Sequence, residues 1–250
     1  MTAPGRTGPA LPVLARKAFA ELLGSILLAA TVVGSGIAAQ RLSPGDTGLQ
    51  LLENALITGA VLVALILALG PVSAAFNPVV TVAERIFGAV TTKAAALFIT
   101  AQVSGCCLGV MLANLMFGLS PVNISQHSRS ADGLWLGEVM ATFGLLVVIF
   151  GVVRGGRGNH VGYAVGGYIT AAYWFTSSTS FANPAITIAR TLSNTFAGIA
   201  PGSVALFVLM QLLGGALAVG AVVLLYPNAA QVAGELTHLN LPLTPSEASS

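Results

Sequence analysis

Long apolar stretches separated by short polar segments run along most of this chain. A helix needs about 20 residues to cross the roughly 30 Å hydrocarbon core of a bilayer, and six stretches are candidates. They are Ala18–Ala39, Asn54–Leu69, Ala94–Phe117, Leu134–Val153, Val161–Phe175 and Val204–Tyr226. The second and fifth look short on apolar residues alone. The pattern predicts an all-α membrane protein with six transmembrane helices.

An Asn-Pro dipeptide follows each of the two short stretches. Proline is favoured in the first turn of a helix because it has no N–H to leave unsatisfied, and asparagine is a common residue just before it. We therefore expect a short helix to begin at each dipeptide, at membrane depth. The two tripeptides are Asn77-Pro78-Val79 and Asn183-Pro184-Ala185.

Composition supports placing the chain in a membrane. The sequence is 55% hydrophobic and 7% charged, with a mean hydropathy of +0.88, which excludes a soluble globule with a solvated surface. If six spans alternate, the ten basic residues divide seven to three. The larger group is Arg6, Arg16, Lys17, Arg85, Lys93, Arg154 and Arg157, and the smaller is Arg41, Arg129 and Arg190. The positive-inside rule then predicts that both termini are cytoplasmic.

The second half of the chain repeats landmarks of the first. Glu21 in the first span corresponds to Glu138 in the fourth, and Gln102 in the third corresponds to Gln211 in the sixth. Each half thus has a glutamate, an Asn-Pro dipeptide and a glutamine in the same order, as expected after an internal duplication. Because each half has three spans, the second half enters the membrane from the opposite side. The two Asn-Pro helices then point at each other.

These paired motifs resemble those of the aquaporin, or major intrinsic protein, family, which carries two Asn-Pro-Ala boxes on half-helices that meet at mid-membrane. The segment Ser73–Phe76 is similar to the family's Ser-Gly-x-His-Phe with one residue missing, and Val79 stands where alanine is usual. The resemblance implies six transmembrane helices and two re-entrant half-helices in an inverted repeat. It also implies a homotetramer in the plasma (inner) membrane. The implied domains are a cytoplasmic segment at 1–15, a channel domain at 16–226 with halves at about 16–120 and 130–226, and a cytoplasmic tail at 227–250.

The resemblance implies a passive channel for water and small neutral solutes. Two helix N-termini meeting at mid-membrane repel protons and cations by their positive dipole ends. The amides of Asn77 and Asn183 can donate to a passing oxygen. A carboxylate in hydrocarbon needs partners, and in the family the residues equivalent to Glu21 and Glu138 support the re-entrant loops. Gln102 and Gln211 either satisfy loop carbonyls or line the lumen, and we expect them to support the loops together with the glutamates.

Selectivity is where the sequence departs from the family pattern. The family's narrow filter usually has arginine directly after the second Asn-Pro-Ala box, and here that residue is Ile186. By the same resemblance, the other filter positions fall on Thr58, Ser180 and Tyr173, or Ala171 if the fifth-span loop has no deletion. A ring of Thr, Tyr, Ser and Ile has no fixed charge. We therefore expect a filter that is more permissive than a strictly water-selective one.

Charged residues follow both half-helices. Arg190 lies four residues after Ile186 and so on the same helix face. It either lines the pore mouth or pairs with a loop carbonyl or a lipid phosphate on the outer surface. We expect Glu84 and Arg85, near the end of the first half-helix, to face the cytoplasm as solvated charges.

Filters without the arginine resemble those of bacterial aquaporins associated with arsenic resistance, which are thought to pass neutral metalloids. Glycerol and arsenious acid are therefore candidate solutes beside water. Three alternatives remain: a strictly water-selective aquaporin, a coupled secondary transporter, because inverted repeats also build transporters, and a pore blocked by Tyr173 or Phe181. The sequence shows no nucleophile–base pair, metal-ligand cluster or phosphate-binding loop. We therefore expect no enzyme activity, cofactor, metal or nucleic-acid partner.

Overall fold

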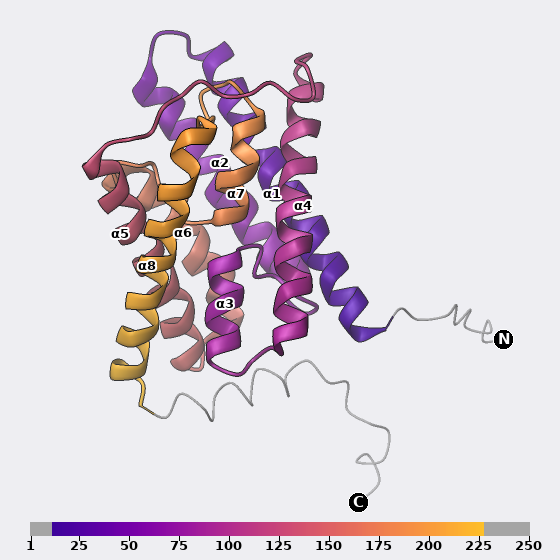
Figure 1. The fold of residues 1–250 in the computed structure, drawn as a ribbon, viewed down its shortest axis with the longest axis vertical. Coiled ribbons are helices and arrows are strands. Elements are labelled where there is room, and N and C mark those ends of the chain that lie inside the picture. Colours follow the sequence, from indigo (N-terminus) through magenta and orange to yellow (C-terminus); the bar gives the residue numbers. More distant parts are fainter. Residues whose placement is uncertain (1–11, 228–250) are drawn as a thin grey trace, which may run out of the picture.

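A computed structural model describes residues 12–227 of this chain, and within that range the regular elements are helical. Eight α-helices and two short 3₁₀ turns, η1 and η2, lie in the described part. The α-helices are α1 (Val13–Leu42), α2 (Thr47–Leu69), α3 (Pro78–Ile86), α4 (Thr92–Met116), α5 (Asp132–Arg154), α6 (Val161–Phe175), α7 (Pro184–Ala189) and α8 (Pro201–Leu225). The turns are η1 (Gly158–His160) and η2 (Arg190–Leu192). The predicted all-helical membrane fold is confirmed, with α3 and α7 as the two short helices (Figure 1).

The prediction that two spans are short is correct for one of them only. Helix α2 begins about two turns before the predicted start at Asn54, and its 23 residues are long enough to cross a membrane. Polar residues near the start of α2 made this span look short in the sequence. One of them, Asn54, is buried and donates from its side-chain Nδ2 to the Val32 carbonyl at 2.9 Å. Helix α6 has 15 residues and covers only about 22 Å, so it is the short span.

The two halves of the chain pack in equivalent ways. Helix α1 lies against α4 in the first half, and α5 lies against α8 in the second. A β-carbon on Gly105 would meet the backbone of α1, and one on Gly214 would meet the backbone of α5. Small residues therefore allow both pairs of helices to approach closely. The halves also interlock, because α7 contacts α4 and α3 contacts α8.

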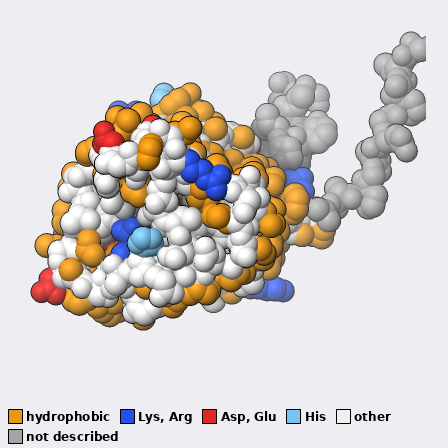
Figure 2. Space-filling model, turned by 90° about the horizontal axis from the view of Figure 1, so that it is seen from above, with side chains coloured by type: hydrophobic (Ala, Val, Ile, Leu, Met, Phe, Trp, Pro, Cys, Tyr) orange, Lys and Arg blue, Asp and Glu red, His pale blue; other side chains and the backbone are white. Residues whose placement is uncertain are grey.

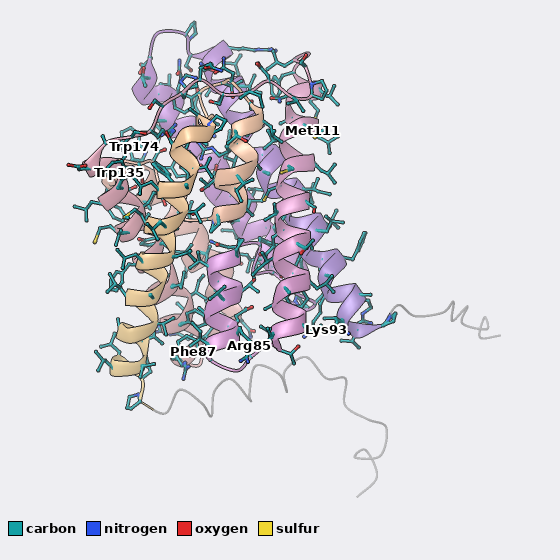
Figure 3. The ribbon with its side chains drawn as sticks, viewed as in Figure 1. Arg85, Phe87, Lys93, Met111, Trp135 and Trp174 are labelled. Carbon is teal, nitrogen blue, oxygen red and sulfur yellow. The ribbon has the colours of Figure 1, made fainter. Side chains whose placement is uncertain are left out.

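The half-helices α3 and α7 lie one above the other in the centre of the bundle (Figure 1). Helix α1 begins and α8 ends at the lower end of the molecule in this view, where Arg85 and Lys93 also lie (Figure 3). Trp135 and Trp174 lie near the upper end, as aromatic residues do at a membrane interface (Figure 3). The predicted boundary at residue 16 falls inside α1. Most of the predicted terminal segments, 1–15 and 227–250, lie outside the described residues.

Candidate functional site

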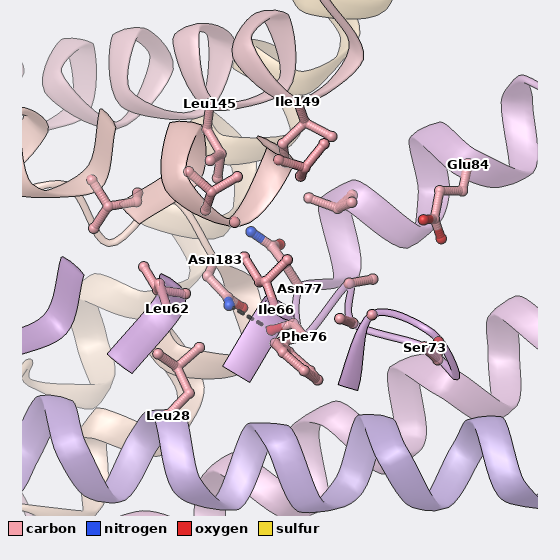
Figure 4. Close-up of a pocket in the computed structure, with 18 of the residues that line it drawn as sticks. Leu28, Leu62, Ile66, Ser73, Phe76, Asn77, Glu84, Leu145, Ile149 and Asn183 are labelled. Carbon is pink, nitrogen blue, oxygen red and sulfur yellow. Dashed lines mark hydrogen bonds between the residues drawn. The ribbon is translucent and has the colours of Figure 1, made fainter. Parts of the chain in front are cut away.

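The two Asn-Pro motifs begin α3 and α7 as the sequence predicts, and they also tie the two halves together. The Asn77 side chain accepts a hydrogen bond from the Val79 amide at 3.0 Å, and Asn183 accepts one from Ala185 at 3.0 Å. Each side-chain amide also donates across to the other half. Asn77 donates to the Ala182 carbonyl at 2.7 Å, and Asn183 to the equivalent Phe76 carbonyl at 2.8 Å (Figure 4). One amide hydrogen of each asparagine is left over for the space between them.

The residue before each asparagine has a strained backbone. Phe76 and Ala182 both have φ of 48°, in the left-handed region that non-glycine residues rarely occupy. Such strain persists only where the surroundings hold it, and it concentrates at functional sites. The two loops that lead into the half-helices are therefore held in place by other groups.

Glu21 and Glu138 hold these loops from behind. Glu21 accepts the backbone amides of Ala75 at 2.9 Å and Phe76 at 2.8 Å. Glu138 accepts those of Phe181 and Ala182, both at 2.9 Å. Both carboxylates are fully buried, so these hydrogen bonds give each buried carboxylate the donors that it needs.

The two glutamines complete the same networks. Gln102 donates to Glu21 at 2.9 Å, and Gln211 donates to Glu138 at 2.6 Å. Each also donates to a half-helix hydroxyl, Thr81 at 2.9 Å and Thr187 at 2.8 Å. The glutamines lie outside the set of cavity-lining residues, and they contact the supporting carboxylates in place of loop carbonyls, so their part in loop support runs through the two glutamates.

A cavity of about 690 Å³ extends between the two half-helices and continues along the loops that precede them. Asn77 and Asn183 face it together (Figure 4). Leucine and isoleucine side chains form its walls on either side of the asparagines (Figure 4). The labelled apolar residues are Leu28, Leu62 and Ile66 on one side and Leu145 and Ile149 on the other. At this level the two asparagine amides therefore lie between apolar walls, which suits small uncharged solutes that carry a few hydroxyl groups.

The four predicted filter residues line this cavity together. They are Thr58, Tyr173, Ser180 and Ile186. The hydroxyl groups of Thr58 and Tyr173 are 3.2 Å apart, and the Ser180 hydroxyl has no hydrogen-bond partner among the described residues. Ala171, the alternative to Tyr173, is exposed on α6 and does not line the cavity. The geometry therefore favours Tyr173 at the fifth-span position.

Four charged residues also line the cavity: Lys17, Glu84, Arg154 and Arg190. Arg190 is only 2% exposed and lines the cavity beyond Ile186, as one of the two alternatives expects. The expectation that Glu84 is a solvated charge was wrong, because its side chain is half-buried and lines the lower part of the cavity. Arg85 is exposed and donates to Thr92 at 2.8 Å. Both residues lie within α3, and which of them faces the cavity depends on how that helix packs in the bundle, which residue spacing alone does not give.

Sequence reasoning missed Arg129, in the loop between α4 and α5. Its guanidinium lies 4.9 Å from the centre of the Phe181 ring, and its Nε donates to the Gly198 carbonyl at 3.1 Å. Phe181 was considered only as a block, yet it lines the cavity beside Arg190. A lone arginine in a polar loop carries no motif that would have indicated this contact.

Comparisons with known proteins agree with this geometry. The family model described as major intrinsic protein matches residues 11–169. The chain is 48% identical over 202 residues to "Aquaglyceroporin AqpS" of Rhizobium meliloti (strain 1021), covering 80% of this chain and 86% of that protein. It is 29% identical to "Probable aquaporin NIP7-1" of Arabidopsis thaliana, covering 66% of this chain and 61% of the relative.

A solved structure has the same fold. The aquaglyceroporin from Plasmodium falciparum matches with a TM-score of 0.66 and 19% identity, over 87% of this chain and 99% of that one. The matched family model covers more than half of the sequence, and the Rhizobium relative is similar over most of its length. The chain therefore belongs to the major intrinsic protein family, whose members are membrane channels and not enzymes.

Proposed function

We propose that this chain conducts water and small neutral solutes down their gradients through the cavity between α3 and α7. The observation that carries the proposal is that both asparagine amides and all four filter candidates line one continuous cavity. Family membership and the similarity to an aquaglyceroporin support glycerol as one solute. Coupled transport has less support, because the buried carboxylates of Glu21 and Glu138 are both committed to loop amides.

Each set of residues has a proposed role. Asn77 and Asn183 give a passing oxygen a hydrogen bond at the point where two positive helix ends meet, which excludes protons and cations. The hydroxyl groups of Thr58, Tyr173 and Ser180 replace hydrogen bonds that the solute made to water before it entered the pore. Ile186 closes the ring with an apolar side chain in place of the family's usual arginine.

The finer choice of solute follows from this ring. Arsenious acid is uncharged and polyol-like at neutral pH, so a path lined by Thr and Ser hydroxyls suits it as it suits glycerol. We propose both as solutes beside water. A strictly water-selective pore is the second candidate, and it is favoured by the contact between Thr58 and Tyr173, which places an aromatic ring at the filter.

Membrane placement and assembly complete the proposal. The lower end of the bundle carries Arg85 and Lys93, and the positive-inside rule assigns that end to the cytoplasm. Both termini then lie in the cytoplasm, with the protein in the plasma (inner) membrane. Family membership supports a homotetramer with one pore in each subunit.

Stopped-flow light scattering on proteoliposomes tests the proposal. Water, glycerol and arsenious acid fluxes are compared for the parent protein, for Ile186→Arg and for the matched control Ile186→Leu. We expect the parent and the leucine variant to pass all three and the arginine variant to pass mainly water. A parent that passes water alone supports the water-selective alternative, and one that passes nothing overturns the proposal.

A further inference from the structure

The cavity has a fixed positive charge beyond Ile186, although the filter ring itself has none. Arg190 follows Ile186 by one helical turn, and both side chains line the same cavity. Helix α7 ends at Ala189 and the chain tightens into the 3₁₀ turn η2, which begins with Arg190. The arginine is therefore at the end of the half-helix, between the filter ring and the upper mouth.

Phe181 and Ala197 position the Arg190 guanidinium. Its carbon Cζ lies 3.5 Å from the centre of the Phe181 ring, and its Nε donates to the Ala197 carbonyl. The terminal nitrogens make no hydrogen bond to other described residues, which leaves their N–H groups for the cavity. A guanidinium stacked on a ring and held by one carbonyl has a fixed position.

A second guanidinium shares the same ring. Arg129 lies over Phe181 at 4.9 Å, and its own backbone amide donates to the Ser203 hydroxyl at 3.0 Å. Neither arginine forms an ion pair with a carboxylate in the described part of the chain. The oxygens of Glu138, which supports the same loop, accept from two loop amides and from Gln211. Figure 2, which looks down on the upper end, shows Lys or Arg side chains and a His side chain at a hollow in this face.

We propose that Arg190, supported by Arg129 through Phe181, is the charge that excludes cations from this pore, set one turn outside the filter ring. The inference rests on the proposed channel and adds a specificity-determining residue to it. An arginine in the ring itself would narrow the path as well as charge it. Moved to the mouth, the same charge repels ions over several ångströms while the ring of Thr, Tyr, Ser and Ile stays open to larger neutral solutes.

This division separates two properties that one filter arginine would combine. Size selection depends on Ile186 and its ring, and charge selection depends on Arg190 together with the positive ends of α3 and α7. Removing Arg190 should therefore raise cation passage in a protein that still conducts water and glycerol. The helix dipoles remain in every variant, so the loss of exclusion is partial.

Proteoliposomes with a trapped pH-sensitive dye measure proton flux under a potassium diffusion potential, and the same vesicles report water and glycerol fluxes by light scattering. We expect Arg190→Gln to raise proton flux about tenfold or more, since a unit charge this close to the path strongly changes the energy of an ion in it. The matched control Arg190→Lys keeps the charge and should stay proton-tight. An Arg190→Gln protein that conducts glycerol and remains as proton-tight as the parent overturns the inference.

A second variant keeps the test decisive if Arg190→Gln does not fold. Phe181→Leu leaves both arginines in the chain but removes the ring that holds them, and we expect it to raise proton flux severalfold. Arg129→Gln should have a smaller effect of the same sign. A proton-tight Phe181→Leu channel contradicts the positioning role. A parent protein that passes neither water nor glycerol overturns the proposed function instead, whatever its proton flux.

Discussion

Asn183 donates its side-chain amide to the carbonyl oxygen of Phe76 at 2.8 Å, so the start of the second half-helix is fixed by the loop of the first. The reciprocal bond runs from Asn77 to Ala182. The two half-helices therefore do not simply meet at mid-membrane. Each asparagine closes its own helix and holds the opposite loop, which makes the centre of the pore a single cross-linked unit.

Replacing Asn77 by alanine should loosen both halves at once. The Asn77→Ala variant loses the cap on the Val79 amide and leaves the buried Ala182 carbonyl without its donor. We expect a loss of about 1–3 kcal/mol in stability, since an unsatisfied buried polar group costs that much. Thermal unfolding of the detergent-solubilised protein measures it. Thr100→Ala is the control, because Thr100 is exposed and bonds only to its own helix. Equal midpoints for the two variants would contradict the cross-linking role.

Glu138→Gln should damage the second loop without changing the shape of the side chain. A carboxylate can accept from Phe181, Ala182 and Gln211 together, whereas an amide has one accepting oxygen and an NH₂ group that opposes the other donors. We expect a stability loss of about 3 kcal/mol and reduced water flux, because the strained loop lines the pore.

Asp132→Asn provides the control for this variant, since Asp132 is an exposed acid on the same helix. The repeat adds a second check: Glu21→Gln should be as damaging as Glu138→Gln. A Glu138→Gln protein with parental stability and flux would show that the loop holds its conformation without the carboxylate.

Much of this arrangement could be predicted because the chain repeats itself. The order of Glu21, its Asn-Pro motif and Gln102 predicted an inverted pair of half-helices, and the fold agrees. The direction of long side chains could not be predicted in the same way. Glu84 faces the cavity because of how α3 packs in the bundle, and Arg190 because the Phe181 ring and a carbonyl lie within its reach. Such contacts depend on tertiary structure, and residue spacing does not encode them.

The Tyr173 hydroxyl should help polyols more than water. In Tyr173→Phe the Thr58 hydroxyl loses its partner and the ring of filter groups loses one hydrogen-bonding oxygen. A hydrogen bond is worth about 0.5–1.5 kcal/mol, so glycerol flux should fall roughly two- to tenfold while water flux changes little. Vesicle swelling in glycerol measures it. Tyr163→Phe is the control because Tyr163 lies on the same helix but is 58% exposed. Unchanged glycerol flux in Tyr173→Phe would remove Tyr173 from the filter.

Two glycines of α8 allow the helix packing to be tested with a single methyl group. A β-carbon at Gly214 would meet the Val139 carbonyl on α5, whereas one at Gly220 would meet nothing nearby. Gly214→Ala should therefore push α5 and α8 apart and cost about 1–3 kcal/mol in stability. Gly220→Ala should leave stability unchanged or slightly raised, because alanine is the better helix former. Thermal midpoints in detergent compare the two, and water flux shows whether the pore keeps its shape. Equal thermal midpoints for the two variants would show that the close approach of α5 and α8 does not require a glycine at position 214.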